Sequence, residues 1–271
     1  ILSGGIDSTI ISKMIENISE PSFFISLNHI GKDKISNQIN KFQKFFKKDI
    51  KLIHVSLDKY YYNLKKSLKI NASPINSHDF PGKLILAEEV KKRGCKAIFG
   101  GDGADELFGG YNTYSEKIKN YRVNNSDYSK YIKSKIKFSR ISELPFKNKL
   151  DTLWKNSEKA YQFLKKDEKN RQSMMLMDTA IQLSSVGLRG TDLMFMSNAI
   201  EPRSVFLRKD IIKFALNLPL EFKIDLSGKK EFKTKILLKK IFTKYFPKEL
   251  IFQKQGFSGF PNETIKFLEN P

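Results

Sequence analysis

Apolar and polar positions in the first part of the chain follow a pattern that predicts strands separated by helices. Short apolar runs, typical of buried parallel strands, occur at 22–27, 51–57 and 96–99. Other segments carry apolar residues at helical spacing, and these lie at 8–18, 35–46, 58–69 and 83–94. Strands that alternate with helices in this way predict a parallel sheet covered by helices.

The pattern changes after about residue 112. Strand signals fade there, and segments with helical spacing follow at 115–137, 147–166, 170–188, 209–216 and 231–245. We therefore predict an α/β fold in two parts. Residues 1–112 form a core with a parallel sheet, and residues 113–271 form a mostly helical extension.

A glycine-rich turn opens the chain, between an expected strand end at residues 1–2 and the helix that begins near Asp7. Backbone N–H groups at such a turn, together with the helix dipole, bind anions. The lysine of the common NTPase loop is absent, and Asp7 would repel a phosphate unless a divalent cation lay between them. The turn therefore predicts that phosphate and Mg²⁺ bind together.

A second glycine-rich turn follows the strand expected at 96–99, and Asp105 stands at the start of the next helix. Acidic residues favour a helix start, but this alone does not explain why glycines and carboxylates are so dense here. Ligands in open α/β sheets bind outside the carboxyl ends of the strands. Asp7 and Asp105, each at such an end, could hold one Mg²⁺ against the phosphates of a nucleotide.

These segments resemble a known family. Residues 3–8, Ser-Gly-Gly-Ile-Asp-Ser, are similar to the pyrophosphate-binding loop of ATP pyrophosphatases. Residues 101–111, Gly-Asp-Gly-Ala-Asp-Glu-Leu-Phe-Gly-Gly-Tyr, resemble the second motif of the glutamine-hydrolysing asparagine synthetases. Residues 192–207 and 254–257 match two further segments of that family, so the resemblance covers nearly the whole chain.

The resemblance implies an ATP pyrophosphatase domain of the adenine nucleotide alpha hydrolase type, with its nucleotide-binding core in residues 1–112. It implies that ATP adenylates the side-chain carboxylate of aspartate and that ammonia then yields asparagine, AMP and pyrophosphate. The cofactors implied are ATP and Mg²⁺, and the partners are aspartate and ammonia.

Site residues follow from the same resemblance. The residues implied to bind ATP and pyrophosphate are Leu2, Ser3, Gly4, Gly5, Asp7, Ser8, Ile25 and Gly101. Asp7 and Asp105 are the implied metal ligands. Asp102 replaces the acidic residue that takes a proton from ammonia, and Lys254 would reach the α-phosphate.

Departures from the family pattern leave the carboxylate substrate open. Leu193 replaces a usual arginine, and Arg208 replaces an aspartate. A related amidotransferase or a β-lactam-synthetase-like ligase, acting on another carboxylate, is therefore an alternative. Asp192, Glu201 and Arg203 are interpreted as a buried ion-pair network that holds the helical part on the sheet.

The formal net charge of +20 raises the question of a nucleic-acid partner. The basic residues are nearly all lysines spread along the predicted helices, which is typical of a solvated surface, so we expect no nucleic-acid partner. A tRNA-modifying ATP pyrophosphatase and a non-catalytic nucleotide-binding relative remain alternatives. His54, within an apolar run, is interpreted as a core histidine.

Location and completeness are expectations from the same sequence. No apolar run is long enough to span a membrane and no signal peptide pattern occurs, so we expect a cytoplasmic protein with no membrane partner. Because Ile1 falls inside an expected strand, we expect the chain to be a piece of a longer protein. The family's N-terminal glutaminase domain, which would supply ammonia, has no counterpart here. A homodimer of the full-length protein is left open.

Overall fold

The computed structural model describes residues 1–29, 33–72, 77–115 and 147–252. These residues form two compact units, each made of separate stretches of the chain. The first unit contains the described residues of 1–102, 184–208 and 238–252, and the second contains those of 103–183 and 209–237. The division predicted at residue 112 marks the end of a nucleotide-binding core. It stays a prediction, because the two compact units are defined by contacts and not by nucleotide binding.

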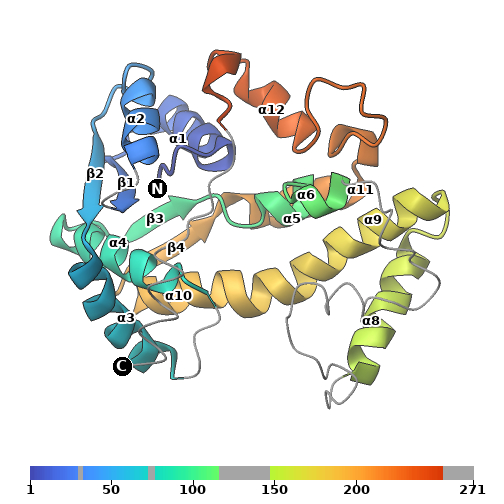
Figure 1. The fold of residues 1–271 in the computed structure, drawn as a ribbon, viewed down its shortest axis with the longest axis horizontal. Helices are drawn as coiled ribbons and strands as arrows, with labels where there is room; N and C mark the ends of the chain where they lie inside the picture. The colour runs from blue at the N-terminus through green and yellow to red at the C-terminus, as the bar shows by residue number, and fades with distance from the viewer. Residues whose placement is uncertain (30–32, 73–76, 116–146, 253–271) are drawn as a thin grey trace. The chain divides into compact units, whose positions relative to one another are not determined.

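The first unit contains two parallel strand pairs (Figure 1). β1 (Phe24–His29) pairs with β2 (Ile50–Val55), and β3 (Ala97–Gly100) pairs with β4 (Glu201–Ser204). The opening residues lie between the pairs: Leu2 N–H donates to the Ile25 carbonyl of β1 at 2.9 Å. The nitrogen of Ile1 donates to the Phe99 carbonyl of β3 at 2.8 Å. The expected strands β1, β2 and β3 are present and each pairs in parallel, but they belong to two separate two-stranded sheets, so a single parallel sheet is not confirmed.

β4 was not predicted from the sequence. Its residues, Glu-Pro-Arg-Ser, carry no apolar run, and the strand is short. It forms because the backbone of this segment pairs in parallel with β3, with Phe99 opposite Arg203. β4 is therefore a strand because it pairs with β3, and its own residue pattern does not predict it.

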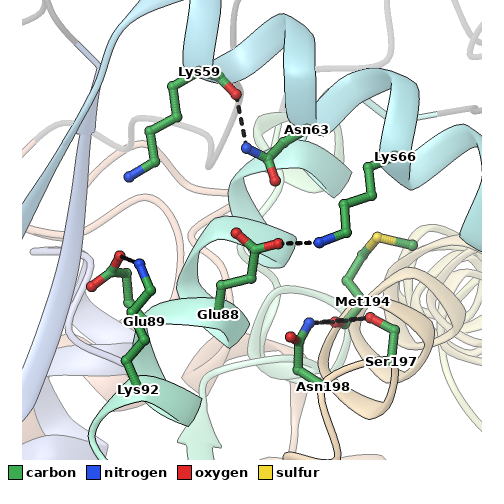
Figure 2. A network of polar contacts seen from close by, with 9 residues as sticks. All are labelled: Lys59, Asn63, Lys66, Glu88, Glu89, Lys92, Met194, Ser197 and Asn198. Carbon is green, nitrogen blue, oxygen red and sulfur yellow. Dashed lines mark hydrogen bonds and ion pairs between the residues drawn. The ribbon is translucent and has the colours of Figure 1, made fainter.

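Helices predicted between the strands are confirmed to within a few residues. They are α1 (Ile6–Ile18), α2 (Asp33–Gln43), α3 (Leu57–Asn71) and α4 (Phe80–Lys92). Residues 80–87 of α4 are all buried, because α4 packs against both α3 and α10 (Arg189–Met196). Figure 2 shows the polar side of this packing, where Lys66 of α3 pairs with Glu88 of α4 at 2.5 Å. The core of the unit gathers apolar residues of β1, α3, α4 and α10.

The second unit is helical in its described residues. Its helices are α5 (Ala104–Phe108), α6 (Asn112–Ser115), α8 (Lys147–Ala160), α9 (Lys166–Met177) and α11 (Lys209–Asn217). Its core packs Trp154, Tyr114 and methionines of α9 against Leu220 and Ile224. The predicted helix at 115–137 lies almost entirely outside the described residues.

One helical run extends without a break from Lys166 to Met196. It consists of α9, a π-helical stretch (Asp178–Leu188) and α10. The sequence predicted a single α-helix at 170–188, because apolar spacing does not distinguish a π-helix from an α-helix over this length. The boundary between the two compact units, at residues 183 and 184, falls within the π-helical stretch.

The last helices are short. α12 (Ile236–Phe242) covers only part of the predicted helix at 231–245. Single turns of 3₁₀-helix occur at Val205–Leu207, Leu220–Phe222 and Lys248–Leu250. No helix of the described residues is both long enough and apolar enough to cross a membrane.

Candidate nucleotide-binding and catalytic site

The turn before α1 is held by a small set of hydrogen bonds. Ser3 N–H donates to the Ser8 hydroxyl at 3.1 Å, and the two serine hydroxyls lie 2.9 Å apart. Gly4 adopts a positive φ of 78°, which favours glycine at this position. These contacts bring residues 3 to 8 into a closed loop, and phosphate binding by this loop stays a prediction.

The start of α1 has the polarity of an anion site. Gly5 is the N-cap residue and has no side chain to accept a hydrogen bond from the first helical N–H groups. An α-helix gives its first N–H groups no acceptor within the helix, and its dipole is positive at this end. Asp7 lies in this first turn and is half-buried. A phosphate here would meet both the N–H groups and the Asp7 carboxylate, a combination that suits Mg²⁺–phosphate better than phosphate alone.

The end of β3 lies against this turn. A Cβ atom on Gly101 would lie 3.1 Å from the Asp7 Cβ and 3.3 Å from the Ser8 nitrogen. A side chain at residue 101 would therefore crowd the start of α1. The contact brings the two glycine-rich motifs together, although more than ninety residues of chain separate them.

The residues expected to contact adenosine are neighbours in the first unit. Leu2 is fully buried, Ile25 is 2% exposed, and their backbones are hydrogen-bonded. Gly101 follows β3, which is linked to Ile1 through the Phe99 carbonyl. Leu2 thus lies next to Ile25, near the beginning of β1, and Gly101 follows the end of β3 beside the turn.

Asp102 stands one residue beyond this contact. Burial raises the pKa of its carboxyl above the ordinary value. The positive charge of Lys83 lowers this pKa, whereas the negative charge of Asp79 raises it. The nearby hydroxyls of Ser204 and Thr191 also lower this pKa. The Thr191 hydroxyl itself donates to the Gly187 carbonyl at 3.0 Å. Asp102 itself is half-buried.

Lys83 was not singled out in the sequence. Its side chain is buried on α4, and its ammonium pairs with the Asp79 carboxylate at 2.7 Å. It also donates to the Gly187 carbonyl at 3.3 Å. The signal that could have revealed Lys83 is its position as a charged residue within the apolar run 80–87.

Asp105 is described within the second unit. The Lys235 ammonium lies 2.6 Å from Asp105 Oδ1, and Lys235 is only 6% exposed. Gly110 makes room for this pair, because a Cβ there would lie 1.8 Å from Asp105 Oδ1 and 2.3 Å from Lys235 Cε. Lys235 was missed in the sequence because one lysine among many gives no signal.

A second carboxyl beside Asp105 is also buried. The Tyr111 hydroxyl donates to Glu106 Oε1 at 2.6 Å. Burial raises the pKa of Glu106, and it raises the pKa of Tyr111 as well. The Tyr111–Glu106 hydrogen bond therefore ties the residues after the short helix α5 back to the helix that carries Asp105.

Two site predictions remain without a geometry. Asp7 belongs to the first unit and Asp105 to the second, so a shared Mg²⁺ stays a prediction. Lys254 lies outside the described residues. Within the described ranges, no group of three or more His, Cys, Asp or Glu side chains could hold a metal ion. Mg²⁺ often binds through one or two carboxylates and substrate phosphates, and Asp7 fits that donor set.

Two structural interpretations were wrong. His54 is exposed, whereas the next residue of β2, Val55, is buried, so the side chain of His54 lies outside the core. Asp192 is exposed as well, and the Glu201–Arg203 pair has exposed side chains at 60% and 53%. Glu201 and Arg203 lie on β4 with the same facing, so they pair at the surface and form no buried network. Leu193, in contrast, packs against the apolar cluster of α4 and α10.

Comparisons with known proteins agree with the motifs. The family model described as asparagine synthase matches residues 1–269. A protein of Methanocaldococcus jannaschii, named "Putative asparagine synthetase (glutamine-hydrolyzing) 1", is 25% identical over 252 residues. The match covers 88% of this chain and 36% of that protein, so the chain spans about a third of the length of this relative.

Proposed function

Because the chain belongs to the asparagine synthase family, we propose that it is the ATP-dependent synthetase part of an amide-forming ligase. The observation that carries the proposal is the contact of Gly101 with Asp7 and Ser8. We propose that the turn binds the phosphates of ATP and that Asp102, one residue beyond this contact, serves the amide-forming step. The two features are neighbours in the first unit, as adenylation followed by amide formation would need.

The reaction has two steps. A substrate carboxylate oxygen attacks the α-phosphorus of ATP, and the bond to the β-phosphate oxygen breaks to release pyrophosphate. Ammonia then attacks the acyl carbon, the carbon–oxygen bond to AMP breaks, and one proton leaves the nitrogen. The N–H groups and hydroxyls of residues 3–8 would bind the leaving pyrophosphate, whose negative charge grows in the first step.

Magnesium would neutralise part of that charge when it is bound. We propose Asp7 and Asp105 as the carboxylates that hold it. Lys235 would add a fixed positive charge next to Asp105, since their charged groups are 2.6 Å apart. Lys254, by the family resemblance, would reach the α-phosphate.

Asp102 would accept the proton that leaves ammonia. To do this it must be ionised, and burial alone opposes ionisation. The nearby hydroxyls of Thr191 and Ser204 lower the pKa of Asp102 and so favour the ionised form.

We propose aspartate as the first substrate to test and ammonia as the nitrogen donor. Leu193 and Arg208 depart from the usual residues of the family, so another carboxylate is the alternative substrate. A glutaminase domain elsewhere in the full-length protein would supply the ammonia, and a cytoplasmic location is proposed with it.

The test measures pyrophosphate and AMP from ATP–Mg²⁺, with aspartate and ammonium each added or withheld. We expect release of pyrophosphate that depends on aspartate, and asparagine only when ammonium is present. Asp7→Asn should lower pyrophosphate release by about a hundredfold, because it removes a carboxylate from the charged transition state.

Asp58→Asn is the matched control, since Asp58 is an exposed acidic residue in the first turn of α3 and lies outside the site. This variant should retain the wild-type rate. Pyrophosphate release without aspartate dependence would direct the search to other carboxylates. Equal rates for Asp7→Asn and Asp58→Asn would contradict the assignment of the turn.

A further inference from the structure

The turn formed by residues 3–8 has a neighbour on α2 that the proposed reaction does not use. A Cβ atom at Gly4 would lie 3.3 Å from Gln38 Oε1 and 3.6 Å from Gln38 Cβ. It would also lie 3.7 Å from Ile39 Cδ1, and Ile39 is only 2% exposed. Helix α2 therefore packs on the turn through Ile39, and this packing brings the side chain of Gln38 to Gly4.

Gln38 and Gly101 approach different residues of the turn. Gly101 lies against Asp7 at the start of α1, whereas Gln38 lies against Gly4. All of these residues belong to the first compact unit. Gly4 directly precedes the N-cap residue of α1, so a group bound by the first N–H groups of this helix would lie within reach of the Gln38 side chain.

The amide group of Gln38 is available for a ligand. Gln38 is half-buried, and among the residues that the structure describes its amide makes no hydrogen bond. Gln43 of the same helix differs, because its Oε1 accepts from Ile50 N–H at 2.8 Å and its Nε2 donates to the Lys48 carbonyl at 3.2 Å. Gln43 thus holds α2 to the start of β2, whereas the structure gives Gln38 no such task.

An amide side chain suits a phosphate. It carries two N–H donors and one carbonyl acceptor at the same end, and a half-turn of the amide exchanges their positions. The nitrogen of Gln38 can thus take the place near Gly4 where Oε1 lies. A hydrogen bond from this nitrogen to an ionised phosphate oxygen is stronger than one between neutral groups.

We propose that Gln38 is a further binding residue of the turn and donates from its side-chain amide to an oxygen of the β- or γ-phosphate of ATP. The inference rests on the proposed function, because that function assigns the turn to these phosphates. The same oxygen belongs to pyrophosphate after the first step, so the hydrogen bond is made before and after the bond to the α-phosphorus breaks. Loss of Gln38 should therefore raise KM for ATP and leave kcat nearly unchanged.

Two substitutions at residue 38 separate the loss of the donor from the addition of a charge. Gln38→Leu keeps a similar volume and removes the amide, so the dissociation constants of Mg²⁺–ATP and Mg²⁺–pyrophosphate should each rise by about tenfold. Gln38→Glu keeps the shape and places a negative charge near the phosphates, so both constants should rise by about a hundredfold. Isothermal titration calorimetry measures them without turnover.

Asn40 provides the matched controls, because it is an exposed residue of the same helix. Asn40→Leu and Asn40→Asp make the corresponding changes away from the turn and should leave both dissociation constants near those of the wild type. AMP lacks the β- and γ-phosphates, so Gln38→Leu should bind it as the wild type does. Weaker binding of AMP with unchanged binding of pyrophosphate would mean that Gln38 contacts the rest of the nucleotide, and would overturn the inference.

Binding by the wild type separates the inference from the proposed function. If the wild type binds neither Mg²⁺–ATP nor Mg²⁺–pyrophosphate, the assignment of the turn fails and the inference fails with it. If the wild type binds both and Gln38→Leu binds them equally well, the inference alone is overturned.

A measurement on the side chain itself gives an independent answer. In protein labelled with ¹⁵N at the glutamine side chains, Gln38→Leu identifies the NMR signal of the Gln38 amide. We expect this signal to shift when Mg²⁺–pyrophosphate is added, and the signal of Gln43 to shift less because its amide is already paired. An unchanged Gln38 signal at saturating pyrophosphate would contradict the inference.

Discussion

Lys223 brings a positive charge into the core of the second unit. It is 1% exposed, and its ammonium donates to Gln172 Oε1 at 2.7 Å. Gln172 in turn donates to the Leu218 carbonyl at 3.0 Å. Burial lowers the pKa of Lys223 from the ordinary 10.5 to about 7. Between these two values the unfolded chain binds a proton that the folded chain does not.

Stability should therefore rise with pH over this window, because the unfolded state loses its extra proton as pH approaches 10.5. Below about pH 7 both states are protonated, and the cost of burying the charge is fully present. We expect Lys223→Met to be more stable than the wild type at pH 6 by about 2–4 kcal/mol, with the difference shrinking toward pH 10.

Denaturant unfolding at a series of pH values checks this. Lys213→Met, at an exposed position of α11, is the control and should follow the wild type at every pH. If the free energies of unfolding of Lys223→Met and the wild type differ by the same amount at every pH, the pKa of Lys223 is not lowered in the folded state.

The helix α10, which carries Thr191, packs against α4. The two helices approach closely because residue 190 is glycine: a Cβ there would lie 2.2 Å from Cε1 of the Phe80 ring. Phe80 is 2% exposed and cannot move aside without disturbing the core. Gly190→Ala should therefore lower the free energy of unfolding by about 1–3 kcal/mol.

A second substitution tests the cause. Phe80→Leu removes the ring that the new methyl group would meet, so Gly190→Ala should cost less in that background. A double-mutant cycle by thermal or denaturant unfolding measures the coupling. Additive effects would mean that the methyl group is accommodated elsewhere.

Among the helices and strands, the sequence predicts those that follow from a local pattern of apolar and polar residues. Helices α1 to α4 and strands β1 to β3 follow from apolar spacing and from glycine-rich turns. β4 and the π-helical stretch do not, because β4 depends on its partner β3 and the π-helix on tertiary context. In the sequence, Lys83 stands out as a charged residue within an apolar run. Nothing in the sequence distinguishes Lys235 from the many other lysines.

The whole molecule carries a formal net charge of +20. A polyanion such as tRNA should therefore bind at low salt through its phosphates, without sequence preference. We expect this binding to weaken by about a thousandfold between 50 and 200 mM salt, and tRNA to leave pyrophosphate release unchanged. Filter binding and the pyrophosphate assay measure both quantities. Stimulation of pyrophosphate release by tRNA would favour the tRNA-modifying alternative.

The acceptor shared by Lys83 and Thr191 is a backbone carbonyl, and every amino acid carries one. A substitution at residue 187 therefore retains this acceptor, so a scan of single substitutions would not detect its contribution. The acceptor depends instead on the count of residues in the helix, since Thr191 stands four positions after Gly187. Insertion or deletion of a single residue near position 187 would break the contact, and we expect natural variants to conserve length here more strictly than identity.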